Sequence, residues 1–157
     1  AWCYGNNVEA RSNMMLAATL AGMAMSNASV ALVHGMSGPL GAYFHLPHGL
    51  ANAILLPHVM EYTYISNPKK FADIAVAMGE KIEGLSLLDA ARKAVEAVKR
   101  LCRDVRVPTL REAGCDESKV LELAPKMAEE ATVTGSYRFN PRRATKEDII
   151  ELYKRAL

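Results

Sequence analysis

The histidines are the residues whose chemistry stands out first. All four of them, His34, His45, His48 and His58, lie in one stretch of the 157-residue chain. His34 follows a run of small apolar residues, and His48 follows Pro47 at the start of a second apolar run. Neutral imidazole binds iron, zinc, copper or nickel without bringing charge into an apolar site. We therefore interpret His34 and His48 as candidate metal ligands.

A structural role is the alternative for each histidine. A single histidine in an apolar stretch is more often a hydrogen-bonded core residue, and the spacing matches no zinc finger and no pair one helical turn apart. We interpret His45 and His58 as structural or surface residues. We expect five methionines to fill the core rather than to bind copper: Met14, Met15, Met23, Met25 and Met36. The cysteines, Cys3, Cys102 and Cys115, form no metal-binding or disulfide motif.

The segments around the histidines are expected to hold them. No Asp, Glu, Lys or Arg occurs between Arg11 and Glu61, so this stretch should be buried on all sides or lie in lipid. The pattern predicts a helix of small residues over 13–33, a loop rich in glycine and proline over 35–47, and a buried helix over 49–60. Each candidate ligand then lies at the boundary of an element, where a rigid scaffold can present it.

The rest of the chain is charged and has clearer helix signals. Caps and apolar residues at intervals of three and four predict helices over 68–79, 86–108, 117–131 and 145–157. No segment has the pattern of a strand, and no internal repeat is present. The prediction is an all-α helical bundle of roughly six to eight helices in a single domain, residues 1–157.

Composition restricts the partners and the compartment. Half of the residues are apolar, 23% are charged and the net charge is +2, which is typical of a globular protein and too close to neutral to indicate nucleic acid. We expect a cytoplasmic protein, because no signal peptide is recognisable and the cysteines are few and scattered. Because the chain begins at Ala1 rather than at a methionine, we expect it to be part of a longer protein.

A membrane hairpin is a second hypothesis for the uncharged stretch. Residues 14–33 are long enough to span a bilayer. The polar cluster of Ser26, Asn27 and Ser29 argues against this, and the second apolar stretch is too short and leads into Glu61. We therefore expect no membrane partner.

Several short sequence motifs are distributed along the chain. They are GMAMSNA at 22–28, VHGM at 33–36, PLG at 39–41, LPHGLANAILLP at 46–57, and NPR at 140–142 followed by Thr145, Glu147, Asp148 and Ile149. Together they resemble the signature of the iron-containing (group III) alcohol dehydrogenases, and the match extends over nearly the whole chain. The resemblance implies the helical C-terminal domain of that family, in the dehydroquinate synthase-like superfamily.

The resemblance also implies a metal site. The family holds a divalent metal, usually iron and alternatively zinc, with one aspartate and three histidines, and His34 and His48 match the last two ligands. The aspartate and the first histidine belong to an Asp-Ala-x-x-His segment that this chain does not contain, and the N-terminal NAD(P)-binding α/β domain is absent from it as well. The two imidazoles should then lie close enough to bind one metal, beside a common cavity.

The activity that the resemblance implies is interconversion of a small alcohol and its aldehyde or ketone. The metal acts as a Lewis acid on the alcohol oxygen, and hydride passes to or from NAD or NADP. The partners would be the small substrate and either the missing N-terminal domain or a second copy in a homo-oligomer. We assign no catalytic residue, and we expect this chain alone to bind metal weakly and to catalyse nothing.

Two positions depart from the family pattern. Many members carry a second histidine four residues after the match to His34, where this chain has Gly38. Met25 stands where members usually have phenylalanine, on the wall of the substrate and nicotinamide pocket. The Gly38 departure and the missing domain motivate an alternative function, a helical interaction module that keeps the fold without catalysis.

Overall fold

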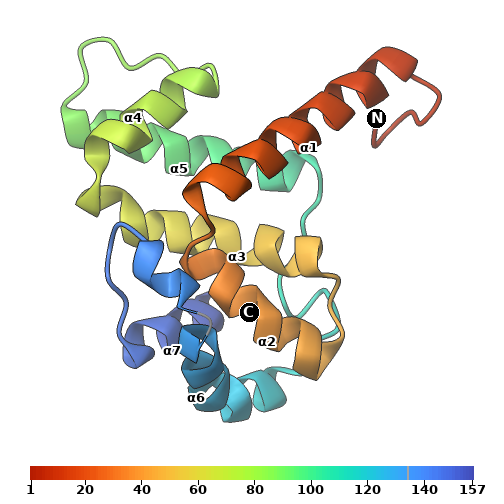
Figure 1. Ribbon diagram of the computed structural model, residues 1–157, viewed down its shortest axis with the longest axis vertical. Helices are drawn as coiled ribbons and strands as arrows, with labels where there is room; N and C mark the ends of the chain where they lie inside the picture. Colours follow the sequence, from red (N-terminus) through yellow and green to blue (C-terminus); the bar gives the residue numbers. More distant parts are fainter. Residues whose placement is uncertain (134) are drawn as a thin grey trace. The chain divides into compact units, whose positions relative to one another are not determined.

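The computed structural model describes residues 1–133 and 135–157, and the regular structure in these ranges is entirely helical, as predicted. It comprises α1 (Val8–Ala28), α2 (Leu32–Phe44), α3 (His48–Thr63), α4 (Pro68–Ala77), α5 (Leu87–Asp104), α6 (Glu117–Val133) and α7 (Lys146–Arg155), together with the 3₁₀ turns η1 (Tyr64–Ser66) and η2 (Ser136–Phe139) (Figure 1).

The chain divides into two units, Ala1–Val30 and Ala31–Leu157. The first unit contains α1, whose N-terminus is capped by Asn7: its side-chain oxygen accepts a hydrogen bond of 2.9 Å from the backbone of Ala10. The helix ends at Ala28, because Ser29 takes a left-handed φ of 65° that interrupts the helix expected over 13–33.

No residue in Val8–Ala28 is buried, so the first of the two alternatives, burial of the uncharged stretch on all sides, is wrong for α1. Its apolar residues are distributed around the helix rather than along one stripe, and its own unit holds no second helix to cover them. The exposed large side chains on this helix are Val8, Met14, Met15, Leu16, Leu20, Met23 and Met25.

In the part of the chain that the structure describes, no single helix supports the membrane hypothesis. Among the described residues no one helix has both the length and the apolar composition to cross a bilayer, and only α1 and α2 taken together, as a bent pair, meet both criteria.

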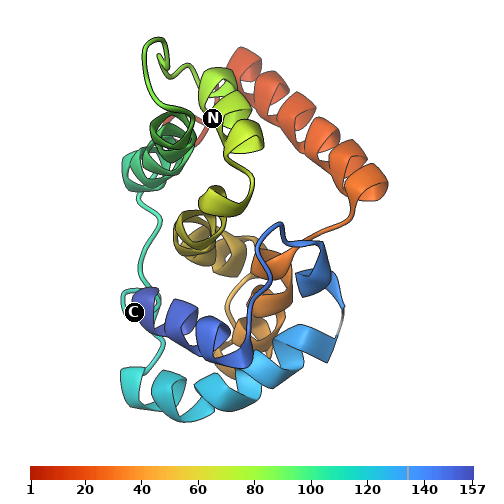
Figure 2. The ribbon, with the colours of Figure 1, turned by 90° about the vertical axis from the view of Figure 1, so that its left-hand side faces the viewer.

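The core of the second unit lies among α2, α3, α6 and α7. Figure 2 shows α6 and α7 side by side, and α2 packs against both α3 and α6. Leu32, Met36 and Leu40 repeat at one-turn intervals along α2 and are fully buried. The buried Tyr153 of α7 donates a hydrogen bond of 2.7 Å to the backbone oxygen of Met36. Burial raises the pKa of this phenol, which stays neutral.

Helices α4 and α5 pack on each other around a smaller apolar cluster of Phe71, Ala75, Ala91, Ala94 and Val95. Asn67 caps the N-terminus of α4 and Ser86 that of α5, close to the predicted helix starts at residues 68 and 86. Helix α5 ends at Asp104, earlier than the predicted boundary at residue 108, because Arg106 takes a φ of 57° that no α-helix continues.

Residues 35–44, predicted as part of a loop, form most of α2. Pro39 inside the helix removes one backbone hydrogen bond, at a cost of about 3 kcal/mol. Burial of Leu32, Met36 and Leu40 contributes roughly 1.5–3 kcal/mol each, which outweighs that loss. The glycines of this segment therefore lie in a helix that packing stabilises, although their turn propensity alone favours a loop.

Gly35 is one of these glycines, and the packing of α2 on α6 requires it. A Cβ atom at this position would meet the backbone oxygen of Ala131 at 2.8 Å and the hydroxyl of Ser136 at 3.0 Å. Gly38 lies one turn after His34, and a Cβ there would meet no described atom within 4 Å. The same residue type thus serves packing at one position of α2 but not at the other.

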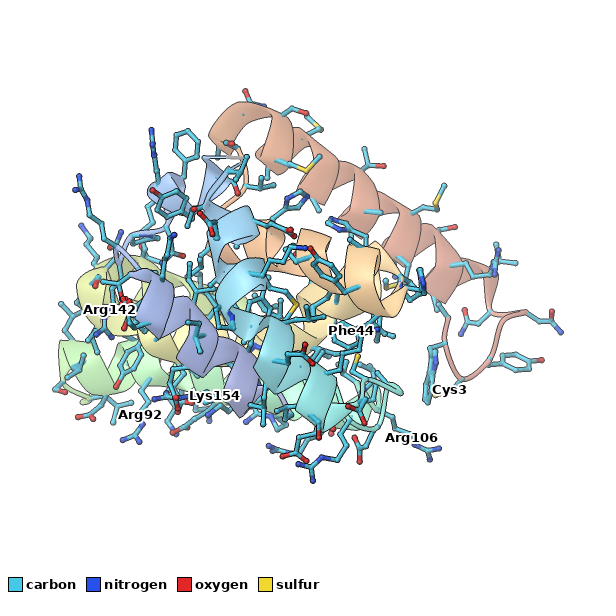
Figure 3. All side chains as sticks on the ribbon, turned by 90° about the horizontal axis from the view of Figure 1, so that it is seen from below. Cys3, Phe44, Arg92, Arg106, Arg142 and Lys154 are labelled. Atoms are coloured by element: carbon cyan, nitrogen blue, oxygen red, sulfur yellow. The ribbon has the colours of Figure 1, made fainter. Side chains whose placement is uncertain are left out.

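The Asn140-Pro141-Arg142 motif fastens the segment before α7 to the end of α3. The buried Asn140 amide donates hydrogen bonds to Thr63 Oγ1 at 3.0 Å and to the backbone oxygen of Arg142 at 2.7 Å. Arg142, labelled in Figure 3, lies 3.9 Å from the ring centroid of Tyr62 and donates to its backbone oxygen at 2.8 Å. This motif is therefore structural.

A capping box starts α7 beside this motif. The Thr145 hydroxyl accepts from the Asp148 backbone N–H at 3.2 Å, and the Asp148 carboxylate accepts from the Thr145 backbone N–H at 2.9 Å and from the Tyr62 hydroxyl at 3.0 Å. The bond from the Thr145 backbone is the main cause that lowers the pKa of Asp148.

The two glycines of α2 should respond oppositely to alanine. Gly38→Ala should stabilise the chain by about 0.5–1 kcal/mol, because it removes the backbone freedom of a helical glycine without a clash. Gly35→Ala should destabilise it by roughly 1–3 kcal/mol, because the Ala131 backbone lies too near. Urea unfolding followed by circular dichroism measures both, and equal effects of the two substitutions would contradict this account of α2.

Asp148→Ala should lower the free energy of unfolding by about 1 kcal/mol at pH 7, the usual contribution of a cap. Since the folded-state pKa of Asp148 is lowered, its contribution is present above the unfolded pKa of about 3.9 and lost as the pH falls through the folded-state value. The difference between wild type and variant should therefore shrink below about pH 4. Glu122→Ala, which removes an exposed carboxylate of α6 outside the capping box, is the control.

Candidate metal centre

His34 and His48 lie together in the second unit. His34 is in the first turn of α2, and His48 is the first residue of α3. Their ring centroids are 4.5 Å apart with planes inclined at 74°. The predicted proximity of the two imidazoles is confirmed; their role as metal ligands stays a prediction.

The connection between α2 and α3 is short and bent sharply at His45. This residue takes a left-handed conformation (φ 55°, ψ 26°), and its backbone N–H ends α2 by bonding to Gly41 at 3.1 Å. Leu46 is buried and anchors the connection, and Pro47 precedes the first turn of α3. Helix α3 therefore begins at His48, one residue before the predicted start, with its first side chain against α2.

Two polar residues hold the His48 ring. Ser37 of α2 is fully buried, and its Oγ lies 3.3 Å from His48 Nδ1 and 2.9 Å from the backbone oxygen of His34. The Asn52 amide nitrogen lies 3.1 Å from His48 Nε2, 3.0 Å from Ser37 Oγ and 2.9 Å from the backbone oxygen of His48. The ring is thus contacted at both nitrogens.

The surroundings keep His34 in its neutral form. Burial lowers the pKa of His34, and the neighbouring His48 lowers it further. A neutral imidazole offers the lone pair that a metal needs, and a pair of imidazoles suits a divalent first-row metal such as iron or zinc. The described residues contain no group of three His, Cys, Asp or Glu side chains able to hold a metal.

The other two histidines do not join this pair. His45 is exposed at the end of α2. His58 is partly buried in α3 and lines a separate cavity of about 240 Å³ with Lys99 and Cys102. Burial and the nearby Lys99 lower the pKa of His58. These surroundings agree with the interpretation of His45 as a surface residue and His58 as a structural one.

Met25 and Gly38 have clear locations. The Met25 side chain is exposed on α1, in the first unit, and its assignment to a pocket wall stays a prediction. Gly38 lies one helical turn from His34, with space for a larger side chain. A Cβ atom at this position would thus meet no other element of the described structure.

Ser37 and Asn52 were missed as site residues in the analysis of the sequence. Ser37 follows His34 by three residues, and Asn52 follows His48 by four, which are the spacings that bring side chains together on a helix. That spacing was the available signal. For Ser37 this spacing is informative only in a helix, whereas the sequence predicts a loop over 35–47.

Comparison with known proteins supports the site motifs. The whole chain, residues 1–157, matches the Fe-containing alcohol dehydrogenase family, C-terminal. The chain therefore belongs to the iron-containing alcohol dehydrogenase family and corresponds to its C-terminal helical part.

The relatives are longer than this chain. It is 48% identical over 153 residues to a 1,3-propanediol dehydrogenase of Klebsiella pneumoniae, covering 97% of this chain and 38% of the relative. It is also 48% identical over 149 residues to a lactaldehyde reductase of Escherichia coli K12, covering 94% and 38%. A crystal structure of a 1,3-propanediol oxidoreductase superposes with a TM-score of 0.92 at 46% identity, covering 99% of this chain and 40% of that one.

The histidine pair should dominate metal binding by this chain. We expect His34→Ala and His48→Ala each to weaken Co²⁺ binding by at least about tenfold. Loss of a direct ligand should cost no less than loss of an outer partner, which typically weakens binding by about 10- to 100-fold. The absorption of Co²⁺ during titration measures the affinity. His45→Ala is the matched control and should bind like wild type. Equal binding by all three variants would contradict the site.

Proposed function

We propose that this chain is the helical, metal-holding part of an iron-containing alcohol dehydrogenase that interconverts a small alcohol and its aldehyde or ketone with NAD or NADP. The observation that carries the proposal is the imidazole pair, with centroids 4.5 Å apart, on the two segments that match the family signature. Relatives named for 1,3-propanediol and lactaldehyde support a small substrate.

His34 and His48 would hold the metal, which is iron in the family and alternatively zinc. When bound, a divalent metal supplies a Lewis acid that stabilises negative charge on a substrate oxygen. The residues of this chain contribute orientation: α2 and α3 fix the two rings, and burial keeps His34 neutral. The buried apolar residues of the same helix, Leu32 and Met36, exclude water from the core side of the pair.

The remaining parts of the enzyme would come from outside this chain. We propose that an N-terminal α/β domain binds NAD(P) and that an aspartate and a further histidine complete the metal ligands, as the family resemblance implies. The chain spans about two fifths of the length of its relatives, which supports this division. We propose that it works in the cytoplasm as one helical domain, either joined to that N-terminal domain or in a homo-oligomer.

A helical interaction module without catalysis is the alternative. The specific observation in its favour is Gly38, which lacks a side chain at the position where many family members carry a second histidine. The two functions differ in whether the histidine pair supports turnover once the rest of the enzyme is supplied.

A chimera tests the proposal. The residues that precede the matching region in the 1,3-propanediol dehydrogenase of Klebsiella pneumoniae are joined to this chain, which is 48% identical to the part it replaces. With ferrous iron added, the chimera should oxidise 1,3-propanediol with NAD, and His34→Ala and His48→Ala should each lower kcat/KM by more than about 100-fold. The 157-residue chain alone should show no turnover.

His45→Ala in the same chimera is the control and should retain activity, since His45 is exposed and outside the pair. A folded, iron-loaded chimera without activity would support the interaction module. Turnover that survives both ligand substitutions would show that the histidine pair has no part in the reaction.

A further inference from the structure

We propose that Ser37 and Asn52 are positioning residues, which hold His48 as the tautomer protonated at Nδ1 and so keep Nε2 as the ligand atom. The inference rests on the proposed metal-binding role of His48 and concerns how the protein prepares that ring before a metal arrives. It is carried by the hydrogen-bond partners available to two side chains.

The argument begins with the single proton of the Ser37 hydroxyl. Ser37 Oγ lies 2.9 Å from the backbone oxygen of His34, which can only accept, so this contact uses the hydroxyl proton. The two lone pairs of Oγ then face Asn52 Nδ2 at 3.0 Å and His48 Nδ1 at 3.3 Å. With its proton committed, Ser37 accepts from both, and His48 Nδ1 must carry a hydrogen.

Because Ser37 is fully buried, its hydroxyl proton bonds to an acceptor of the protein rather than to water. No described side-chain oxygen or nitrogen buried in this way lacks a hydrogen-bond partner, and water cannot replace a lost contact at a fully buried hydroxyl without rearrangement. Neutral histidine carries one ring proton, so a hydrogen on Nδ1 leaves the lone pair on Nε2.

Asn52 stabilises that lone pair and can release it. Its amide nitrogen has two protons and three acceptors in reach: His48 Nε2 at 3.1 Å, Ser37 Oγ at 3.0 Å and the backbone oxygen of His48 at 2.9 Å. When a metal takes the Nε2 lone pair, the two oxygen acceptors remain for the two protons. The exchange therefore leaves neither amide proton without a partner, and the ring keeps its Nδ1–H contact to Ser37.

Nitrogen NMR of the metal-free, 157-residue chain tests the assignment, with two-bond correlations that report which ring nitrogen of each histidine is protonated. At a pH where the imidazoles are neutral, His48 should be protonated at Nδ1. Ser37→Ala should shift its tautomer population toward Nε2–H, because the acceptor is lost. Asn52→Ala should leave Nδ1 protonated and shift only the Nε2 resonance.

His58 provides an internal control, since it lies in a separate cavity and its signals should not move in either variant. Circular dichroism shows whether each variant is folded; should Ser37→Ala unfold, the wild-type tautomer and the partly buried Asn52→Ala remain decisive. A wild-type His48 protonated at Nε2, or an unchanged tautomer in folded Ser37→Ala, would overturn the inference.

Zn²⁺ separates this inference from the proposed function. On addition of zinc, the His48 Nε2 resonance should shift while Nδ1 keeps its proton, and Ser37→Ala should bind zinc about 10-fold more weakly. If the tautomers are as expected but zinc shifts no resonance of His34 or His48, the result would support the positioning role of Ser37 and Asn52. It would contradict the proposed metal-binding role of the two histidines.

Discussion

The burial of one face of α2 is the constraint on which the candidate site depends. Leu32, Met36 and Leu40 occupy that face and are fully buried, which fixes the rotation of the helix about its axis. With this rotation, His34 and, three residues later, Ser37 point away from that face and lie against the start of α3. A rotation that exposed the three core side chains would also separate the imidazoles, so core packing and ligand geometry are determined together.

The features that could be predicted from sequence are those whose signals are local. Thr145 caps α7 with its own side chain, and the motif resemblance identified both histidines of the pair. Helix α2 could not be predicted this way, because Gly35 is required by the distant backbone of Ala131, whereas its local turn propensity indicated a loop. The contact of Ser37 with the His48 ring exists only because α2 packs on α3. The residues that we propose to set the tautomer of His48 could therefore not be predicted without the three-dimensional structure.

The two parts of the uncharged stretch differ in how far their side chains are buried. In α2 and α3 the lack of charge accompanies a core, where residues such as Leu55 and Val59 are buried. In α1 it accompanies exposed apolar side chains, including Met14, Met15 and Leu20. Large exposed apolar patches mark regions that a partner or another part of a protein covers. The composition of the stretch predicts that its apolar side chains are removed from water. It does not predict which contacts cover them.

Gly35 and Gly38 of α2 differ in whether the packing of the helix requires a glycine. A glycine inside a helix costs about 1 kcal/mol relative to alanine, so each needs a reason. At Gly35 the reason is the Ala131 backbone, which leaves no space for a Cβ atom. At Gly38 no described atom lies within 4 Å of a Cβ, the position is exposed, and it is one turn from His34. Packing against other elements therefore does not explain Gly38.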